Sequence, residues 1–369
     1  MRILQLGKFY PVTGGVEKVM FDLLNGLSAK GIACDMLCTN AEPGKPYHVY
    51  TMGDSSIICT KSLTKKFATM IAPQMICELR KICSRYDIIH VHHPDPMAVL
   101  ALRLSGYKGK VILHWHSDIK KQRQILLAYM PLQNWLLRRA DIIIGTTPVY
   151  ISNSPHLAAV TDKCTYVQIG IDPVTPDAEA VNKIRNRYKG KKIVFSLGRL
   201  VHYKGFRYLI DAARELPDDY VVLIGGSGKL HDELQRQIDS YGLNAKVQLM
   251  GYIPGEELPA YYGACDIYCL SSIMKTEAFA IVQLEAMSCG KPVIATDIPA
   301  SGVPWVNRDG VSGLNVEIEN GKALAEAIKK VLGDKELYAK LSAGAKERFN
   351  SMFRKEAMID RCLDIYRQL

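Results

Sequence analysis

The sequence predicts an α/β protein of two doubly wound domains, each built on a parallel sheet. Short apolar runs alternate with amphipathic segments along the chain, as is typical of parallel strands covered by helices on both faces. The chain has 369 residues, which is long for one hydrophobic core and suits two. Ligands of such sheets bind beyond the carboxyl ends of the strands, so we expect the functional residues just after strands.

Ten apolar runs are predicted to be strands. In the first half they are MRILQLG, ACDMLCT, IIHVHH, VILHWHS and DIIIGTT, and in the second half KIVFSLG, YVVLIGG, VQLMGY, IYCLSS and PVIAT. The segments between them, such as VEKVMFDLLNGLSAKG and FRYLIDAARELP, have helical periodicity and are closed by Gly or Pro.

The boundary between the halves is expected near a stretch that contains two prolines, Pro173 and Pro176. We therefore expect a first domain over residues 1–171, a linker over 172–190 and a second domain over 191–345. The last segment, 346–369, is predicted to be a single C-terminal helix that starts near Ala345.

Charge and cysteine usage limit the possible partners and compartment. The net charge is +10, of which residues 1–173 carry +8, and this excess indicates either an anionic partner or a bias for solubility. The ten cysteines show no metal-ligand spacing, which favours free thiols in a reducing compartment. No signal peptide or membrane span is predicted, so a cytoplasmic protein is expected, with possible peripheral contact to the inner leaflet.

A glycine pair follows the first predicted strand. Gly14 and Gly15, in PVTGGV, allow a tight turn and close approach of a ligand to the next helix N-terminus. A plain turn explains the pair equally well. The pattern is not Gly-x-Gly-x-x-Gly, so a dinucleotide cofactor is disfavoured.

Two cations follow the first strand of the second half. Arg199 and Lys204, in SLGRLVHYKG, are placed to face a ligand beyond the strand end, where an Arg fork and a Lys point charge suit phosphate oxygens. A diphosphate leaving group gains charge as its bond breaks, so the pair would stabilise it. A solvated loop is the alternative.

Two glutamates lie eight residues apart in EAFAIVQLE, which is predicted to be a helix that starts at Glu277 and is capped by Gly290. A carboxylate suits that end of the helix dipole, and the amides of Phe279, Ala280 and Ile281 would cradle phosphate or sugar hydroxyls. Glu285 would take both hydroxyls of a ribose. The alternative is that Glu277 only caps the helix N-terminus and that Glu285 is an ordinary surface residue.

Histidines gather at two predicted strand ends, His90, His92 and His93 in HVHH and His114 and His116 in HWHSD, which also holds Asp118. A pocket that hydrogen-bonds sugar hydroxyls or phosphate is favoured. Ordinary core histidines are the second reading. A metal site is the third, without supporting carboxylate or cysteine spacing.

The combination GR-x4-KG, EAFAIVQLEAM and GKPVIAT resembles the retaining glycosyltransferases of family four, which have the GT-B fold: two Rossmann-like domains whose parallel sheets face a central cleft. The similarity runs from GGVEK after the first strand to the C-terminal helix, which in that family crosses back to the first domain. The phrases HWHSDIKKQR, SLGRLVHYKGF and VPWVNRDGVSGL resemble bacterial mannosyl- or rhamnosyltransferases of surface polysaccharide. One departure is PASGVPWVN, where many relatives have Gly-Gly-x-x-Glu.

The resemblance implies a role for each matching position, and the catalytic set would be His116, Arg199, Lys204 and Glu277. Arg199 and Lys204 would hold the diphosphate of a nucleotide sugar, and Glu285 its ribose. Glu277 and the following amides would hold the donor sugar, and His116 would bind that sugar near its reacting face. The first-domain glycines, chiefly Gly15, would approach the phosphates. The base would lie against Gly251, Tyr252 and Ile253. His92, His114 and Asp118 are possible contacts to the sugar or acceptor.

The chain lacks Asp-x-Asp, the carboxylate pair that commonly holds a divalent metal in sugar transfer, so no metal and no cofactor are expected. The resemblance implies a retaining hexosyltransferase that uses GDP-mannose or a related GDP-linked 6-deoxyhexose, with a UDP-sugar as the alternative. The acceptor would be a glycan or a polyprenyl-linked glycan, and no nucleic-acid partner is expected. A nucleotide-sugar epimerase, a phosphorylase and a non-catalytic binding module are the competing classes.

Membrane docking is expected from the first half. Residues 61–85 carry six cations interleaved with apolar side chains, which suits a pair of helices lying on an anionic membrane. Lys120, Lys121 and Arg123 would add to that surface. Packing of the apolar side chains, such as Phe67 and Ile71, on the first sheet is the alternative.

Overall fold

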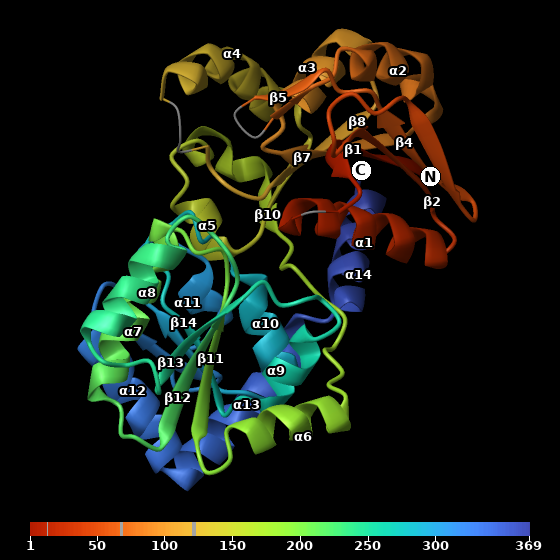
Figure 1. Cartoon of the computed structure of the whole chain (residues 1–369). Coiled ribbons are helices and arrows are strands. Elements are labelled where there is room, and N and C mark those ends of the chain that lie inside the picture. Colours follow the sequence, from red (N-terminus) through yellow and green to blue (C-terminus); the bar gives the residue numbers. More distant parts are fainter. Residues whose placement is uncertain (13, 67–68, 120–122) are drawn as a thin grey trace. The chain divides into compact units, whose positions relative to one another are not determined.

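The computed structural model describes residues 1–12, 14–66, 69–119 and 123–369. Its contacts divide the chain into two compact units (Figure 1). Unit 1 comprises Met1–Ile169 together with Lys355–Leu369, and unit 2 comprises Gly170–Arg354.

Unit 1 contains an eight-stranded sheet of order β10-β9-β8-β7-β1-β2-β4-β3. All neighbours pair in parallel except β3, an edge strand that runs antiparallel to β4. A separate antiparallel pair is formed by β5 and β6. The strands are β1 (Arg2–Tyr10), β2 (Ala33–Asn40), β3 (His48–Met52), β4 (Ser55–Thr60), β5 (Thr64–Lys66), β6 (Thr69–Ile71), β7 (Ile88–His93), β8 (Lys110–Trp115), β9 (Ile142–Gly145) and β10 (Cys164–Tyr166).

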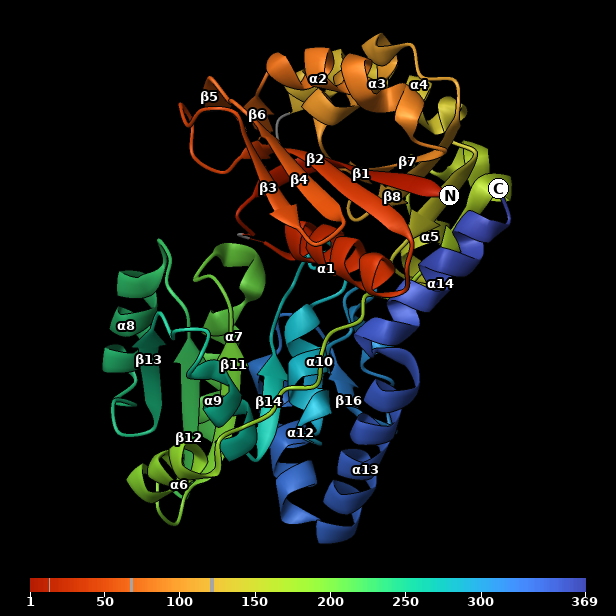
Figure 2. The ribbon, with the colours of Figure 1, turned by 90° about the vertical axis from the view of Figure 1, so that its right-hand side faces the viewer.

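Helices cover both faces of this sheet. In Figure 2, α2, α3 and α4 lie on one face and α1 on the other, where α14 packs against α1. Gly26 permits the close approach of α1 to α14, because a Cβ there would lie 2.0 Å from Cδ1 of Ile359. The helices are α1 (Gly15–Ala29), α2 (Gln74–Ile82), α3 (Pro96–Ser105), α4 (Arg123–Arg139), α5 (Pro148–Ser152) and α14 (Lys355–Arg367), with short 3-10 turns η1 (Cys83–Arg85) and η2 (Ala158–Lys163).

Unit 2 contains a six-stranded sheet of order β13-β12-β11-β14-β15-β16, in which every pair is parallel. Its strands read as apolar runs because both faces are covered. They are β11 (Lys192–Leu197), β12 (Tyr220–Gly225), β13 (Val247–Gly251), β14 (Ile267–Leu270), β15 (Val293–Thr296) and β16 (Gly313–Val316).

The helices of unit 2 form two layers. One layer is made by α8, α7 and α12, whose apolar side chains join the strands in a buried cluster. The other is made by α6, α9, α10 and α13. The bounds are α6 (Ala178–Arg187), α7 (Phe206–Glu215), α8 (His231–Ser240), α9 (Leu258–Ala264), α10 (Ile281–Ser288), α11 (Val303–Val306), α12 (Gly321–Gly333) and α13 (Lys335–Met352), with the 3-10 turn η3 (His202–Lys204).

The predicted fold class is confirmed, since each unit is built on a sheet with helices on both faces, and both sheets are parallel apart from the edge strand β3. Two helix predictions need correction. The expected single helix from about Ala345 to Leu369 is two helices, because the chain leaves helical geometry at Phe353 and restarts at Lys355, where it joins unit 1. Residues 61–85 are not a helix pair, because β5 and β6 occupy the start of that segment and only α2 and η1 are helical.

Candidate functional site

Lys204 and Glu277 form a buried ion pair beyond the carboxyl ends of the strands of unit 2. The Nζ of Lys204 lies 2.5 Å from Oε2 of Glu277, and each side chain is 11% exposed. Ser272 donates a hydrogen bond of 2.9 Å to the same carboxylate oxygen. A charged lysine and a carboxylate held this far from water are strongly coupled, so the loss of either partner would leave an uncompensated buried charge.

Gly205 lets the loop after β11, which carries Lys204, pack against the end of the neighbouring strand β14. Gly205 adopts φ +64°, and a Cβ there would lie 2.1 Å from the carbonyl oxygen of Ser271. Ser271 in turn donates to the carbonyl of Lys204 at 3.0 Å. The GR-x4-KG pattern therefore has a structural reason: only glycine allows this turn to close on β14.

Arg199 lies in the loop just before η3, which begins at His202, and it is exposed. Its Nη2 donates a hydrogen bond of 3.3 Å to the hydroxyl of Tyr203. The guanidinium keeps most of its donors for a ligand, because this single bond engages one of five. The structure thus gives the two predicted cations different settings: Lys204 is buried and paired, and Arg199 is open.

Glu285 lies on α10, and its Oε2 accepts a hydrogen bond from the buried hydroxyl of Tyr262. Burial raises the pKa of the Tyr262 phenol well above its usual value, and the Glu285 carboxylate raises it further, so the phenol is a donor at neutral pH. Tyr262 fixes the orientation of the carboxylate and was not predicted, because its partner lies 23 residues away.

The helix that carries Glu285 begins later than predicted. α10 starts at Ile281, so Glu277 lies in the loop before it and is not the first helical residue. Ala280 caps the helix with φ 62° and ψ 77°, a left-handed conformation that costs energy for a residue with a side chain and recurs at ligand sites. The first amides of α10, beginning with that of Ile281, have no intrahelical partners, whereas Phe279 and Ala280 precede the helix. The cradle formed by these three amides stays a prediction.

The strand-end loops of β11, β12 and β13 are bonded to one another. The Gly226 amide donates to the carbonyl of Gly251 at 2.7 Å, and the Leu200 amide donates to that of Ser227 at 2.9 Å. A Cβ on Gly226 would lie 2.0 Å from the carbonyl oxygen of Gly198. The loop GGSG at 225–228 was missed as a functional signal, and its glycines are what let these loops meet.

The three residues predicted to face a base differ in exposure. Gly251 has φ +68° and forms the end of β13, Tyr252 is 77% exposed, and Ile253 is 6% exposed. In unit 1, Gly14 is extended and caps α1, and Gly15 is its first residue, as the strand–glycine–helix pattern predicted.

The histidines of unit 1 lie inside strands, which corrects the prediction that they follow them. β7 holds three of them and β8 ends at Trp115, so His116 alone comes after its strand. His92 is 0% exposed and His114 is 1% exposed, so neither ring is available to a bound molecule in this structure. Direct contacts of these two residues to sugar or acceptor therefore have no support in this structure and stay a prediction, and His116, which is also buried, keeps 6% of its surface exposed.

A trio of these rings could hold a metal by distance alone, because nitrogens of His90, His92 and His114 lie within 4.8 Å of one another. Both nitrogens of His92 are already engaged, Nδ1 with His116 at 3.0 Å and Nε2 with Gln5 at 2.8 Å. The trio would have to break one of these bonds to bind an ion, which disfavours the metal reading.

Asp118 forms hydrogen bonds to other residues of unit 1. Its Oδ1 accepts hydrogen bonds from the indole of Trp115 at 3.0 Å and from the hydroxyl of Ser154 at 2.7 Å. Its amide donates to the hydroxyl of Tyr150 at 2.8 Å. These bonds give Asp118 a structural role and do not support a contact to substrate.

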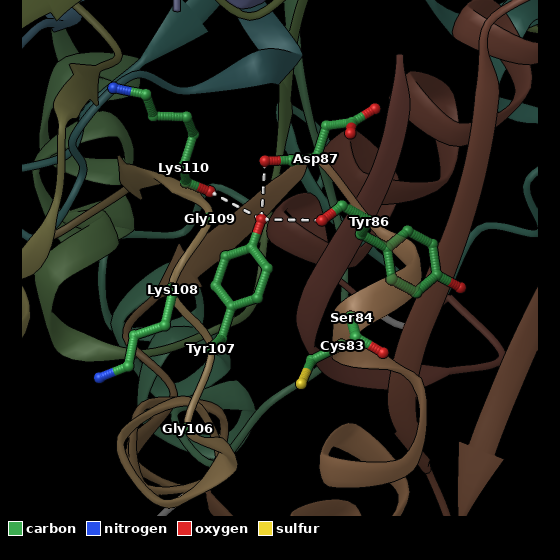
Figure 3. A pocket seen from close by; sticks show the side chains of 9 residues that line it. All are labelled: Cys83, Ser84, Tyr86, Asp87, Gly106, Tyr107, Lys108, Gly109 and Lys110. Atoms are coloured by element: carbon green, nitrogen blue, oxygen red, sulfur yellow. Dashed lines mark hydrogen bonds between the residues drawn. The ribbon is translucent and has the colours of Figure 1, made fainter.

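One open hollow, of about 480 Å³, lies at the amino ends of β7 and β8 (Figure 3). The side chain of Tyr107 lines this hollow, and its hydroxyl donates to the carbonyl oxygens of Tyr86 and Asp87. Ligands of parallel sheets bind at the opposite ends of the strands, so this hollow is not the predicted site.

The fold of the two units defines a class of protein, the GT-B glycosyltransferases. The model for "Glycosyltransferase Family 4" matches residues 13–174, and that for "Glycosyl transferases group 1" matches residues 177–348. The O-antigen chain mannosyltransferase C of Escherichia coli is 30% identical over the whole chain and 99% of its own length. The chain belongs to glycosyltransferase family four and is a hexosyltransferase.

Two further comparisons agree. D-rhamnosyltransferase WbpZ of Pseudomonas aeruginosa is 28% identical over 96% of this chain and 92% of its own. The crystal structure of Anabaena Alr3699/HepE in complex with UDP and glucose matches all of both chains with a TM-score of 0.80 at 18% identity, which supports the GT-B fold. Among the described residues, no helix is both long and apolar enough to cross a bilayer.

Proposed function

We propose that the protein transfers a hexose, with retention of configuration and without a metal, from a nucleotide sugar to a glycan or lipid-linked acceptor of surface polysaccharide. The observation that carries this proposal is the buried Lys204–Glu277 pair beside the open Arg199, in a family-four chain similar along its whole length to an O-antigen mannosyltransferase. This arrangement sets a cation for the diphosphate beside a carboxylate for the sugar.

In the proposed mechanism, Lys204 and Arg199 stabilise the charge that develops on the diphosphate as the glycosidic bond breaks. Glu277 and the amides before and at the start of α10 hold the sugar and distal phosphate. The acceptor hydroxyl attacks from the face that the diphosphate leaves, and the departing phosphate takes its proton. Positioning and charge stabilisation then provide most of the rate enhancement.

The donor is proposed to be GDP-mannose or a GDP-linked 6-deoxyhexose. Full-length similarity to a mannosyltransferase and a rhamnosyltransferase favours it. A UDP-sugar is the alternative, favoured by the solved Anabaena structures that hold UDP or UDP-glucose. A calorimetric panel of GDP, UDP and their sugars decides between them, and tighter binding of UDP than GDP would reverse the choice. The anomeric configuration of the product, read by NMR, tests retention.

We expect activity to survive chelation. The two cations Arg199 and Lys204 supply the positive charge that a divalent metal would otherwise bring to the diphosphate. Transfer rates measured before and after EDTA treatment should agree. A loss of activity that Mg²⁺ or Mn²⁺ restores would contradict metal independence.

Glu285→Ala should raise the donor KM by about ten-fold or more, since a carboxylate that accepts ribose hydroxyls makes charge-assisted hydrogen bonds. The kcat should change less, because the ribose is remote from the breaking bond. Tyr262→Phe is the matched control: it removes the bond that orients Glu285 and keeps the carboxylate, so its effect on KM should be smaller. An unchanged KM in Glu285→Ala would remove the ribose role.

Docking of unit 1 on an anionic membrane is also proposed, with a revised surface. Met70 and Met75 are buried in the unit, so they do not form the apolar face that the sequence suggested. The cations that remain exposed are Lys61, Arg80, Lys81 and Arg85. Of the other apolar residues of the predicted surface, Leu63 is exposed, and Ile71 and Ile76 are partly buried. Lys120, Lys121 and the side chains of Lys65, Lys66, Phe67 and Arg123 lie outside the described part of the chain.

Because that surface is chiefly electrostatic, binding should need anionic lipid and weaken with salt. Liposome co-sedimentation at several salt concentrations measures it. The double substitution Arg80→Ala and Lys81→Ala should weaken binding, and the exposed cations Lys322 and Lys330 of unit 2, changed in the same way, should not. Absence of binding at low salt would end this part of the proposal.

A further inference from the structure

A chain of hydrogen bonds runs through the interior of unit 1 from His116 to the last helix. It lies on the face of the sheet that α14 covers, and it links side chains from four elements that are far apart in the sequence. The members, in order, are His116, His92, Gln5, Tyr366 and His90.

The chemistry of Gln5 sets the direction of the chain. Its Oε1 lies 2.8 Å from Nε2 of His92, and a carbonyl oxygen only accepts, so His92 carries its proton on Nε2. The other nitrogen of His92 is then an acceptor. It lies 3.0 Å from Nε2 of His116, so His116 must carry its proton on Nε2.

The far end of the chain is consistent with that direction. The amide nitrogen of Gln5 donates to the Tyr366 hydroxyl at 3.5 Å and to Sγ of Cys34 at 3.7 Å. The Tyr366 hydroxyl lies 2.6 Å from Nδ1 of His90, and which of the two atoms donates depends on the tautomer of His90. Gln5, His92, His90 and Tyr366 are at most 2% exposed, so water does not compete for these bonds.

One nitrogen at the end of this hydrogen-bond chain, Nδ1 of His116, is neither sealed nor hydrogen-bonded among the described residues. His116 keeps 6% of its surface exposed, and its Nδ1 is not among the sealed, unpartnered polar atoms that include both ring nitrogens of His114. In the described part of the chain His116 makes no side-chain hydrogen bond other than the one to His92. Its Nδ1 therefore offers a lone pair at the surface of unit 1.

We propose that Gln5, His92 and Tyr366 are positioning residues that hold His116 as the Nε2–H tautomer, so that Nδ1 accepts a hydrogen bond from a sugar hydroxyl. The part that concerns the sugar rests on the proposed function. Burial lowers the pKa of His92 and His116 well below the usual value, so both rings stay neutral and the tautomer matters at neutral pH. The same geometry explains why a polar glutamine stands between the buried residues Leu4 and Leu6 of β1.

The test is the tautomeric state of His116 in the free protein, read by long-range ¹H–¹⁵N correlation spectra of histidine-labelled enzyme and assigned with His116→Asn. We expect Nε2 to be protonated. A spectrum with Nδ1 protonated would overturn the proposal by itself, whatever the activity of the enzyme, because Gln5 would then be turned the other way.

Variants separate positioning from packing. Gln5→Met keeps the bulk of the side chain and removes the acceptor, so His116 should populate both tautomers and kcat should fall by about three- to ten-fold. Ile112→Val, on the same face of the sheet, loosens packing and leaves the chain of hydrogen bonds intact. The tautomer of His116 in this variant should be that of the wild type. A folded Gln5→Met protein with an unchanged tautomer would refute the positioning role. Should Gln5→Met not fold, the wild-type spectrum still decides.

Discussion

Lys204→Ala is expected to lower kcat by about 10²-fold or more, because one preorganised cation at a developing charge is typically worth about 3 kcal/mol of transition-state stabilisation. The same reduction in kcat is expected for Arg199→Ala. Because the Arg199 guanidinium makes one intramolecular hydrogen bond, to Tyr203, this substitution should change stability less than Lys204→Ala does. Steady-state kinetics at saturating donor measure both. Wild-type kcat in either variant would refute that residue's assignment.

The buried pair also links Lys204 to stability, and this must be separated from catalysis. Removing Lys204 alone leaves the Glu277 carboxylate buried without its partner, so the protein should also melt earlier. The double variant Lys204→Ala and Glu277→Gln removes both charges and should regain much of the stability but none of the activity. The matched control is Lys183→Ala, which breaks an exposed lysine–glutamate pair on α6 and should change neither property.

The second large effect is acid lability of unit 1. Burial lowers the pKa of His93 and His114 to about 3, and it lowers the pKa of His90, His92 and His116 well below the usual value. An unfolded chain binds protons at these residues below about pH 6.5, whereas the folded unit does not. Stability is therefore complete above that pH and falls as the pH drops from about 6.5 toward 3. Each such histidine contributes up to about 1.4 kcal/mol per pH unit.

Hydrogen exchange of the full chain at pH 7 and pH 5, corrected for the intrinsic rate, locates this loss. Strands β7 and β8 should lose protection at pH 5. Strands β11 and β12 of unit 2 serve as the internal control, because the histidines of that unit, His202 and His231, are exposed. Equal loss of protection in both units would show that the buried imidazoles are not its cause.

Much of the fold follows from local patterns. Apolar runs of parallel strands and the strand–glycine–helix start of α1 were predicted because each depends on neighbouring residues. The break between α13 and α14 was not, because Phe353 continues the apolar periodicity and is fully buried, so the pattern does not show where the helix stops. The predicted helix pair over residues 61–85, with Met70 and Met75 on its apolar face, was wrong for a similar reason, because apolar side chains are the same in sequence whether they face lipid or a core.

Site residues were likewise predicted where the signal is local in sequence and missed where it is not. Lys204 and Glu277 were found because their motifs are compact, although their pairing joins positions 73 residues apart in the sequence. Tyr262 and Gln5 were missed, since each acts through hydrogen bonds to residues distant in sequence. His92 and His114 were assigned to a ligand because alternation in a strand does not say which face is covered, and α14 covers theirs.

The central claim is that the enzyme moves a sugar from a nucleotide sugar to a separate acceptor through Lys204 and Glu277. Incubation with labelled GDP-mannose and related donors, with and without a lipid-linked glycan acceptor, tests it most directly. The account predicts label on the acceptor, with release of the nucleoside diphosphate, and loss of both in Lys204→Ala. An epimerised donor formed without acceptor, phosphate-dependent cleavage, or binding without turnover would contradict it.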